Sequence, residues 1–395
     1  MKLLGLPGRP PPHACTMYRM AWPWQALDGQ IEYRIAEATV DLPTIAEYDL
    51  LVFQRQEMPQ IEQVTRIAQQ MDGGMMTSPW TAQGLGWRDV TRIEAGHHVG
   101  KKVVFDIDDD AVNIPPSNIN YLQWGRDRRQ IISMLQRMKA GGMKGDLMNE
   151  RPELVAERAR QHFKQLLANI RAADAVTVTT PSLKQVYGKY NRNVYVLPNW
   201  VVPHEWEEVQ PQEHEGIHLG WAGGPTHYSD IKVFAGSVKQ ILQEYPHVKL
   251  VIAGFPVARP MFFDDVPEDR IITYPFMAEW RRNLATFDVI LAPSDANKFN
   301  RGKSAIRVYE GLCATKGQAA VVGSETTYGD TIRALGCGFA CKTFSDWLRA
   351  LRTFIEDKDK RLAMGRRGYD GMMAGHTYEH HAGEWLATYR RVLNG

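Results

Sequence analysis

Short apolar runs that alternate with helical stretches constrain the fold of this chain most strongly. The runs are rich in Val, Ile, Leu and Phe, and they include KLLGL (2–6), YDLLVFQRQ (48–56), KKVVFDIDDD (101–110), HVKLVIAGF (247–255) and FDVILAPSD (287–295). Continuous apolar runs of this length are typical of strands buried on both faces of a parallel sheet. Because helical spacing follows most of them, the sequence predicts an α/β protein with right-handed crossovers.

Length and composition narrow the class further. At roughly 150 residues per domain, a chain of 395 residues is expected to form two domains. The 44% hydrophobic and 23% charged residues are those of a globular protein. The formal net charge of +2 gives no general argument for a nucleic-acid or membrane partner, so such an argument needs a local patch.

Several absences indicate a cytoplasmic protein. The N-terminus MKLLGLPGRPPPH lacks the pattern of a signal peptide, and no apolar run approaches the roughly 20 residues that span a bilayer. The four cysteines have no C-x-x-C spacing, and they indicate a reducing compartment: Cys15, Cys313, Cys337 and Cys341.

The stretch NKFNRGKSAIRVYE (297–310) is the main candidate for a binding site, because it follows an apolar strand and leads into a helical segment. A helix start carries partial positive charge, and Lys303 adds a full charge, so together they can bind phosphate. Ser304 is expected to cap the helix, and Glu310 to accept hydrogen bonds from sugar hydroxyls. The alternative is a surface helix with salt-bridged turns.

Read as K-S-x-x-R-x-x-E, this stretch resembles the nucleotide-binding helix of retaining glycosyltransferases with the GT-B fold (glycosyl transferases group 1, family 4-like). In many of these enzymes two glutamates stand eight residues apart, and Glu310 matches the second, which binds ribose. Gly302 occupies the first position, so the chain resembles a divergent branch. The resemblance implies that Lys303, with Arg301 or Arg307, stabilises the departing diphosphate.

The segment IHLGWAGGPTHYSDIKVF (217–234) is a predicted strand, a glycine-rich turn and a helix beginning near Ser229 or Asp230. Gly223 and Gly224 allow the backbone to approach a ligand closely. In the resembled family this turn faces the donor diphosphate and the transferred sugar. His227 and Asp230 match a recurring Gly-x-x-x-His-x-x-Asp pattern there.

The DIDDD cluster stands at the end of the strand at 101–110, where parallel sheets bind ligands. Its carboxylates can orient an acceptor, act as a base or hold a metal. We favour Asp108 as catalytic and Asp109 as acceptor-side, with His97 and His98 as alternatives; the other possibility is helix capping. The resemblance argues against a metal, because these enzymes use protein cations.

Arg19 follows the loop GRPPPHACTMYR (8–19), which separates a first strand from a helix expected at 20–29. The loop lacks G-x-G-x-x-G, which weakens a dinucleotide-binding interpretation. In the resembled enzymes the equivalent loop lies near both substrates. The interpretations of Arg19 are therefore an acceptor-side group and a solvated arginine.

A basic segment interrupts the strand–helix alternation between Ala111 and Arg171. Within it, residues 118–146 hold six basic and two acidic side chains, with Tyr121 and Trp124 among them. Such a segment can follow nucleic-acid phosphates or lie on an anionic membrane. The other interpretation is a solvated helix with one buried side. Contact with DNA through 121–144 is one hypothesis for the acceptor.

The predicted fold is α/β, of GT-B type, with two Rossmann-like domains, parallel sheets that face across a cleft, and a last helix that crosses back. The unit ADAVTVTTPSLKQVYGKYNRNVYVLPNWV (173–201) resembles the end of the first domain in that family, where a Pro-Asn pair opens the linker. We expect an acceptor domain at 1–202 with an insert at about 111–171, a donor domain at 203–375 and a C-terminal helix at 376–395.

The resemblance implies transfer of a sugar from a nucleoside-diphosphate sugar, UDP- or GDP-linked, to an acceptor hydroxyl with retention of configuration and no tightly bound cofactor. The acceptor is a glycan, a protein or a hydroxylated base in DNA, whose base would be flipped. Three rivals remain: a nicotinamide-dependent oxidoreductase, a sugar-nucleotide epimerase and a noncatalytic nucleic-acid-binding module.

Overall fold

The computed structural model describes residues 1–9, 11–36, 40, 42–54, 93, 96–97, 99–140, 146–275 and 279–395. The chain forms two compact units. The first contains Met1–Val112, Tyr121–Pro198 and His381–Gly395, and the second contains Asn113–Asn120 and Asn199–His380. The helical pattern at 61–71 and His98 lie outside the described residues.

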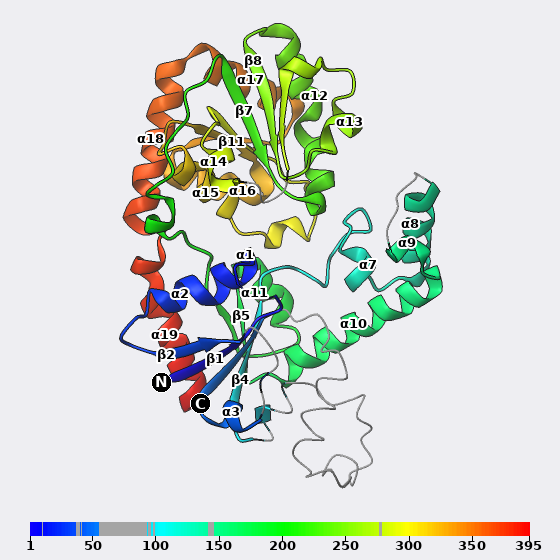
Figure 1. Cartoon of the computed structure of the whole chain (residues 1–395), viewed down its shortest axis with the longest axis vertical. Coiled ribbons are helices and arrows are strands. Elements are labelled where there is room, and N and C mark those ends of the chain that lie inside the picture. The colour runs from blue at the N-terminus through cyan, green and yellow to red at the C-terminus, as the bar shows by residue number, and fades with distance from the viewer. Residues whose placement is uncertain are drawn as a thin grey trace. The chain divides into compact units, whose positions relative to one another are not determined.

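The first unit contains a parallel sheet of six strands in the order β2-β1-β3-β4-β5-β6 (Figure 1). Central strands β3 and β4 are almost wholly buried, as expected of continuous apolar runs. The strand bounds are β1 (Lys2–Leu6), β2 (Glu32–Ile35), β3 (Leu50–Gln54), β4 (Lys102–Ile107), β5 (Ala175–Val178) and β6 (Val194–Val196).

The helices of the first unit differ from the prediction near the N-terminus, where residues 14–19 are helical and not a loop. Buried Thr16, Arg19 and Met20 recur at helical spacing there, a signal that the neighbouring Gly and Pro residues obscured. The helices are α1 (Ala14–Thr16), the π-helical turn η1 (Met17–Ala21), α2 (Trp22–Gln25), α3 (Leu42–Ala46), α7 (Tyr121–Trp124), α8 (Arg128–Ala140), α9 (Asp146–Asn149), α10 (Pro152–Ala172) and α11 (Pro181–Tyr187).

The insert between β4 and β5 is mainly helical. Helices α7 to α10 form an arm that extends away from the sheet of the first unit, with the 21-residue α10 as its longest element (Figure 1). Ile131, Met134 and Leu135 form the buried side of α8, while Val155, Ala159 and other small or apolar residues form that of α10. The arm therefore has its own apolar seam.

The second unit contains a second parallel sheet of six strands, in the order β12-β11-β10-β7-β8-β9. Adjacent strands β7 and β10 form its topological switch point, since the chain leaves them toward opposite edges of the sheet. The bounds are β7 (Ile217–Ala222), β8 (Val248–Ala253), β9 (Ile271–Tyr274), β10 (Val289–Ala292), β11 (Ala320–Ser324) and β12 (Gly338–Cys341). Strand β12, with the sequence GFAC, is not among the predicted apolar runs.

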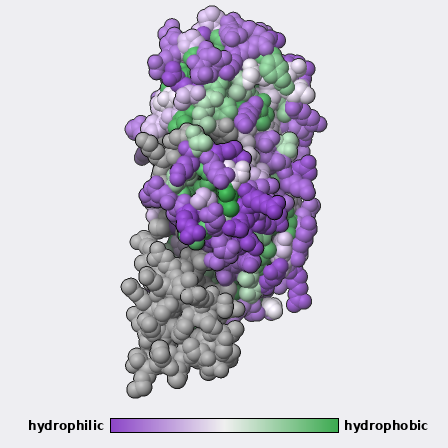
Figure 2. Space-filling model, turned by 90° about the vertical axis from the view of Figure 1, so that its right-hand side faces the viewer, coloured by the Kyte–Doolittle hydropathy of each residue, from purple (hydrophilic) through white to green (hydrophobic). Residues whose placement is uncertain are grey.

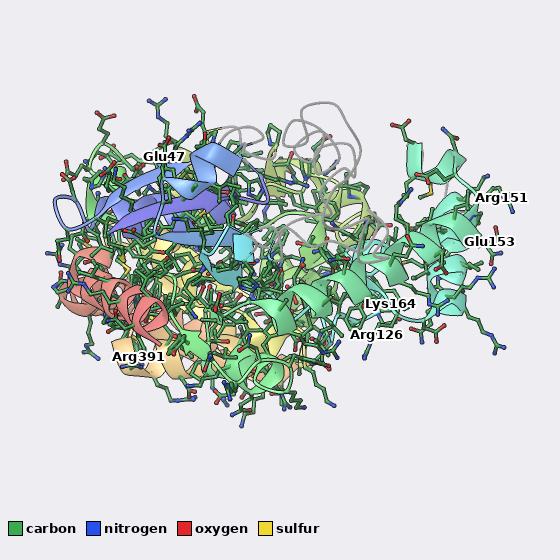
Figure 3. The ribbon with its side chains drawn as sticks, turned by 90° about the horizontal axis from the view of Figure 1, so that it is seen from below. Glu47, Arg126, Arg151, Glu153, Lys164 and Arg391 are labelled. Atoms are coloured by element: carbon green, nitrogen blue, oxygen red, sulfur yellow. The ribbon has the colours of Figure 1, made fainter. Side chains whose placement is uncertain are left out.

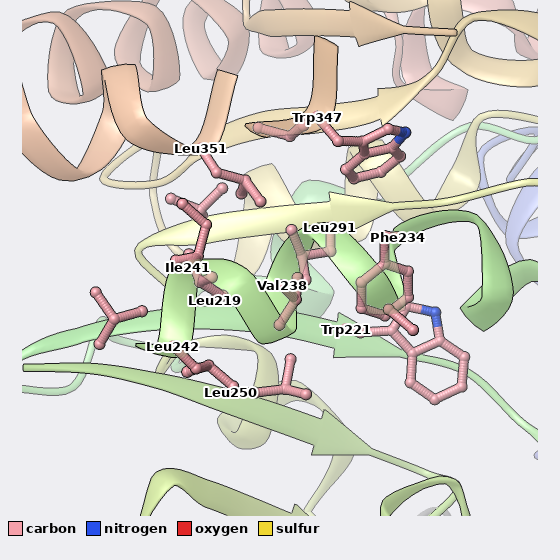
Figure 4. Close-up of a cluster of buried hydrophobic side chains, with 14 of the residues drawn as sticks. Leu219, Trp221, Phe234, Val238, Ile241, Leu242, Leu250, Leu291, Trp347 and Leu351 are labelled. Atoms are coloured by element: carbon pink, nitrogen blue, oxygen red, sulfur yellow. The ribbon is translucent and has the colours of Figure 1, made fainter. Parts of the chain in front are cut away.

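Helices cover both faces of this sheet. On one face, Phe234, Val238 and Ile241 of α12 recur at helical spacing and pack with Trp347 and Leu351 of α17 (Figure 4). The bounds are η2 (Pro203–Trp206), η3 (Pro225–His227), α12 (Tyr228–Glu244), α13 (Ala258–Phe262), η4 (Glu268–Arg270), α14 (Trp280–Leu284), η5 (Asn300–Gly302), α15 (Ile306–Ala314), α16 (Glu325–Leu335), α17 (Phe344–Glu356) and α18 (Lys358–Gly375).

The last helix, α19 (Tyr378–Asn394), begins at the end of the second unit and continues into the first. Within the first unit, Trp24 Nε1 donates to the Tyr389 hydroxyl at 3.0 Å, and the Arg391 guanidinium lies 5.7 Å from the centre of the Tyr195 ring. These contacts confirm that the C-terminal helix crosses back. None of the helices in the described ranges is long and apolar enough to cross a bilayer.

Candidate functional site

The carboxyl ends of β7 and β10 hold the main candidate site, which lies entirely within the second unit. Gly223, Gly224 and His227 follow β7, whereas Arg301, Lys303 and the start of α15 follow β10. Ligands of open α/β sheets bind outside the carboxyl ends of strands at such a switch point. The structure thus brings together two segments that are about 75 residues apart in sequence.

Gly223 is the point where these segments come closest. A Cβ atom at this position would lie 2.9 Å from Trp221 Cζ2, 3.2 Å from Arg307 Nη2 and 3.3 Å from His227 Cδ2. Any side chain would therefore displace the residues around it, which explains the glycine. The same distances show that Gly223, His227 and Arg307 share one small space.

Asp230 connects the segments beneath that space. Its Oδ2 lies 2.8 Å from His227 Nδ1, while its Oδ1 accepts from the Asp295 backbone N–H at 2.9 Å and from Asn300 Nδ2 at 2.9 Å. The Asp230 side chain is 5% exposed and that of His227 is 22% exposed. One buried carboxylate therefore holds the first turn of α12, the loop after β10 and the η5 turn together.

The electrostatics of this pair follow from burial and two nearby cations. Burial, then the charges of Arg307 and Lys303, lowers the pKa of His227 to about 4, although its hydrogen bond to Asp230 acts in the opposite direction. Burial acts to raise the pKa of Asp230, but the hydrogen bond with His227 and the charge of Arg307 lower it overall. At neutral pH the site contains an ionised Asp230 and a neutral His227.

The RGKS turn lies after β10 as expected, but Ser304 does not cap the helix. Helix α15 begins at Ile306, and its N-cap Ala305 makes no side-chain cap bond. The Ser304 hydroxyl instead accepts from Asn199 Nδ2 at 3.3 Å. The single-turn η5 and an extended Lys303 separate the strand from the helix, which shifts the helix start past the serine.

The other predicted donor-side residues surround this turn. The Lys303 ammonium lies 4.5 Å from the centre of the Phe299 ring, and Arg307 Nη1 donates to the Pro293 carbonyl at 3.2 Å. Arg301 is exposed, and Glu310 is half-buried on α15, one turn beyond Arg307. The Gly224 carbonyl accepts from the His227 backbone N–H at 3.0 Å.

Hydroxyl groups beside the site were missed as functional candidates. The Ser294 and Thr327 hydroxyls lie 2.7 Å apart, and Thr327 Oγ1 also donates to the Asn300 carbonyl at 3.0 Å. The Ser324 hydroxyl accepts from the Ser294 backbone N–H at 2.8 Å. Polar residues directly after two buried strands were the signal in the sequence, since neighbouring parallel strands end at one edge.

The aspartate cluster lies at the carboxyl end of β4 in the first unit. Asp108 is half-buried and Asp109 is buried. The buried Tyr187 hydroxyl donates to the Asp109 carbonyl at 2.6 Å and accepts from the Ala111 backbone N–H at 3.0 Å. Asp110 Oδ1 accepts from Val112 N–H at 3.1 Å, so part of the cluster supports its own loop.

Arg19 is fully buried in the first unit. Its Nε and Nη2 donate to the Asp106 carboxylate at 3.0 and 2.7 Å, and its Nη1 donates to the Leu197 carbonyl at 2.5 Å. The guanidinium also lies 4.8 Å from the centre of the Trp385 ring. Burial raises the pKa of Asp106, and Arg19 opposes that shift. These contacts give Arg19 a structural place between η1, β4 and α19.

His97 does not lie with the aspartate cluster. It precedes β4, and its Nε2 lies 2.8 Å from Asp174 Oδ2, just before β5. Asp174 also accepts from Lys102 Nζ and from the Val103 backbone N–H. Because β4 and β5 are parallel, this group is at their amino ends, whereas Asp108 follows the carboxyl end of β4.

The basic segment forms α8 and the turn before it. Asp127 Oδ1 accepts from the backbone N–H groups of Arg129 and Gln130, which leaves this aspartate occupied at the helix start. The exposed basic residues are Arg126, Arg128, Arg129, Arg137 and Lys139. Arg126 and Lys164 lie along one side of the arm, and Arg151 and Glu153 lie near its tip (Figure 3). Residues 141–145 lie outside the described residues.

Within the described ranges, no group of three or more His, Cys, Asp or Glu side chains is arranged to hold a metal ion. Two aspartates of the DIDDD cluster bind protein groups: Asp106 accepts from Arg19, and Asp110 accepts from a backbone N–H of its own loop.

Comparison with known proteins identifies the fold. No protein-family model matches the chain, and no curated protein matches its sequence. Sucrose-phosphate synthase from Thermosynechococcus elongatus is a solved structure with a TM-score of 0.58 and 12% identity over the full length of both chains. HepE from Anabaena, solved with UDP and glucose, has a TM-score of 0.56 and 12% identity over 98% of this chain and 100% of HepE.

A third match is TarM from S. aureus, solved with UDP, at a TM-score of 0.51 and 12% identity. The match covers 75% of this chain but only 51% of TarM, so this chain spans about half the length of that protein. At 12% identity these similarities establish the architecture alone. The chain has the fold of the GT-B glycosyltransferases, as predicted, with two parallel six-stranded sheets.

Proposed function

We propose that this protein is a glycosyltransferase that moves a sugar from a uridine-diphosphate sugar to an acceptor hydroxyl with retention of configuration. The supporting observation is the cationic site at the carboxyl ends of β7 and β10, where Arg307 and Lys303 lie close enough to His227 to depress its pKa. Two cations at the carboxyl ends of adjacent parallel strands suit a diphosphate. HepE and TarM, which share the fold, were solved with UDP, which favours uridine over guanosine.

The proposed reaction needs no protein nucleophile. The bond between the anomeric carbon and the diphosphate oxygen breaks, and the electron pair leaves with the diphosphate. The acceptor oxygen forms its bond to the same face of that carbon, and its proton passes to a diphosphate oxygen. The products are the glycosylated acceptor and UDP.

Each donor-side residue then has a role. Lys303 and Arg307, with the exposed Arg301, balance the charge that grows on the leaving diphosphate. The backbone at Gly223 and Gly224 and the Ser304 hydroxyl contact phosphate oxygens, and Glu310 accepts hydrogen bonds from ribose. On the acceptor side we propose Asp108 and Asp109, which follow the carboxyl end of β4, to orient the hydroxyl.

Nucleotide binding tests the donor site directly. We expect UDP to raise the unfolding temperature more than GDP or ADP, because a ligand at 100 times its Kd stabilises the folded state by about 2.7 kcal/mol. Arg307→Gln should abolish most of the shift. Arg349→Gln, which changes an exposed side chain on α17 of the same unit, is the matched control and should leave the shift unchanged. Equal or absent shifts with all nucleotides contradict the proposal.

Product analysis separates a retaining transferase from an epimerase. Incubation of UDP-glucose with the enzyme and no acceptor should leave the donor sugar unchanged, whereas an epimerase yields an isomer. With an acceptor, the proton coupling constant at the anomeric carbon of the product should match that of the α-linked donor. A β-linked product would rule out retention.

A second proposal concerns the acceptor. The observation behind it is the arm of the first unit, where no carboxylate in the described part of the chain forms an ion pair with Arg126, Arg128 or Arg129. Elsewhere on the arm, Arg158 and Arg160 pair with Glu150 and Glu157. These three arginines, in the turn before α8 and at its start, are therefore available for the phosphates of nucleic acid. The acceptor would then be a hydroxylated base in DNA.

The few apolar side chains on the surface of the arm favour DNA over a membrane as its partner. Figure 2 shows one side of the molecule, where the described residues are mainly hydrophilic with some hydrophobic residues among them. Membrane-surface helices place large apolar side chains beside their basic ones. Among the described residues of α7 to α10, Leu154 is the only exposed large apolar side chain, and it lies on α10.

Salt-dependent binding tests the acceptor proposal. We expect the affinity for duplex DNA to fall with rising salt. The slope of that fall should decrease when Arg126→Gln, Arg128→Gln and Arg129→Gln are combined, by roughly one unit for each phosphate that the variant no longer binds. Arg158→Gln, which removes an arginine already paired with Glu150, serves as the matched control. Binding to anionic vesicles but not to DNA would contradict the choice of nucleic acid.

A further inference from the structure

One ring nitrogen of His227 is hydrogen-bonded to protein, and the other has no partner among the described residues. Nδ1 lies 2.8 Å from Asp230 Oδ2, while no described residue hydrogen-bonds to Nε2. The adjoining Cδ2 edge faces Gly223, since a Cβ there would lie 3.3 Å from it. The His227 side chain is 22% exposed. Nε2 is bonded to Cε1 and Cδ2, so the Nε2 edge lies toward the space that Gly223 and Arg307 share.

The state of Asp230 decides which nitrogen carries the proton. Its carboxylate accepts two other hydrogen bonds, from the Asp295 backbone N–H and from Asn300 Nδ2. Although burial acts to raise the pKa of Asp230, the contact with His227, the charge of Arg307 and these bonds hold it below its usual value, so the carboxylate is ionised and His227 must donate to it through Nδ1–H. In a neutral imidazole the other nitrogen is then an acceptor.

The charges around the ring keep it neutral. Arg307 on α15 and Lys303 on the preceding turn are cationic, Asp230 is anionic, and the buried Tyr328 on α16 lies within the same field. Two cations and burial oppose a third positive charge more than a single carboxylate favours it, and the pKa of His227 falls to about 4. Arg307 and Lys303 therefore supply the positive charge for a diphosphate, and His227 does not.

We propose that Asp230 is a positioning residue that holds His227 as the Nδ1–H tautomer, so that Nε2 accepts a hydrogen bond from a hydroxyl of the bound sugar nucleotide. This inference rests on the proposed donor site and assigns a specific role within it. A hydroxyl can donate to Nε2, whereas a phosphate oxygen without a proton cannot. The hydroxyl belongs either to the ribose or to the transferred sugar.

Asp230→Asn tests the proposal with almost no change of shape. The asparagine oxygen can still accept from Asp295 N–H and Asn300, while its NH₂ group faces His227 Nδ1. The ring must then accept at Nδ1 and carry its proton on Nε2, which converts the outward acceptor into a donor. Nitrogen NMR of labelled histidine should show the Nδ1–H form in the wild type and the Nε2–H form in the variant.

The affinities of UDP and UDP-glucose then report the role of that nitrogen. We expect at least one ligand to bind roughly 10-fold or more weakly to Asp230→Asn, which corresponds to about 1.4 kcal/mol for a lost hydrogen bond. If the transferred sugar donates, only UDP-glucose is weakened. If the ribose donates, both are weakened, and the 2′- and 3′-deoxy forms of UDP lose the difference between wild type and variant.

Asp288→Asn is the matched control. Asp288 also accepts from a backbone N–H and lies near a histidine, His214, but it precedes β10 at the opposite end of the strand. It should leave both affinities unchanged. Unaltered binding of UDP and UDP-glucose by Asp230→Asn, or an unchanged tautomer, overturns the proposal. Failure of the wild type to bind either ligand instead contradicts the proposed function.

Discussion

Each unit buries an aspartate near the carboxyl edge of its sheet, but the two aspartates have different partners. In the first unit, Asp106 pairs with Arg19, and the two side chains are 1% and 0% exposed. In the second, Asp230 pairs with His227, whose side chain remains 22% exposed. The first pair is sealed and joins structural elements. In the second pair only the aspartate is buried, so the partly exposed histidine can contact a ligand. Both aspartates are buried, so burial of the carboxylate does not distinguish the pairs. The difference is that the partner side chain is buried in the structural pair and partly exposed in the candidate binding pair.

The largest expected effect concerns the sealed pair. Arg19→Met leaves the Asp106 carboxylate buried without its partner and should lower the free energy of unfolding by about 3–5 kcal/mol. Denaturation with urea measures it. Arg158→Met, which breaks an exposed pair with Glu150, should cost less than about 1 kcal/mol. If both variants lower the free energy of unfolding by less than about 1 kcal/mol, the buried pair stabilises the fold no more than the exposed pair does.

The second effect concerns catalysis in the second unit. Lys303→Ala should lower turnover by a factor on the order of a hundred, because a fixed charge that stabilises the leaving diphosphate is removed. The exposed Lys298 lies in the same loop, and Lys298→Ala is its control. Circular dichroism should show that both variants fold. Wild-type turnover in folded Lys303→Ala would exclude the lysine from the mechanism.

The third effect is a pH dependence of stability between pH 7 and pH 4, which comes from His227 in the second pair. The pKa of His227 is about 4 in the folded protein and ordinarily 6.5. Between about pH 6.5 and pH 4 the His227 ring binds a proton in the unfolded chain but not in the folded protein. The free energy of unfolding therefore decreases as the pH is lowered from 6.5 to about 4. Between pH 7 and pH 5 the loss is roughly 2 kcal/mol.

Unfolding in urea across this range, for the wild type and His227→Asn, measures that contribution. The variant should lose less stability on acidification by about the same amount. His381→Asn is a control from the first unit, where the histidine is paired with Glu384 on α19. Parallel pH profiles for wild type and His227→Asn would mean that the ring titrates normally.

The smallest expected effect concerns the loop that carries Asp108 and Asp109. Tyr187→Phe removes a buried hydroxyl that bonds to the Asp109 carbonyl and to Ala111 N–H, and it should lower the free energy of unfolding by about 1 kcal/mol. We expect UDP affinity to remain unchanged, since the tyrosine belongs to the first unit. Tyr190→Phe, a nearby tyrosine whose side chain is more exposed, is the control. A large loss of UDP affinity in Tyr187→Phe would contradict the assignment of UDP binding to the second unit alone.

The strands were largely predictable from the sequence. Runs such as KVVFDI and VILA are apolar throughout because parallel strands are covered on both faces, and that pattern is local. The glycine turn after β7 and the cationic turn after β10 were also predictable, since strand ends carry the binding residues of such sheets. The short β12, with its two-glycine boundary at Gly336 and Gly338, lacked such a run.

The partners of the buried charged residues were not predictable. Arg19 meets Asp106 across 87 residues of sequence, and Asp230 meets Asp295 and Asn300 across 65 and 70. Local pattern cannot reveal such pairings, so Arg19 was placed near substrates and Asp230 was left as a motif position. Ser304 was assigned as a cap because serine favours that place, but η5 delays the helix start to Ile306.

The division of the chain between the units has a consequence for its synthesis. The first unit includes the last 15 residues of the sequence, from His381 to Gly395. Trp24 therefore cannot form its hydrogen bond to Tyr389 until that residue, 365 positions later in the sequence, has been synthesised. The second unit draws most of its residues from one uninterrupted stretch, Asn199–His380. Domains usually fold in order of synthesis. Here the unit that begins the chain is completed last, after most of its neighbour has emerged.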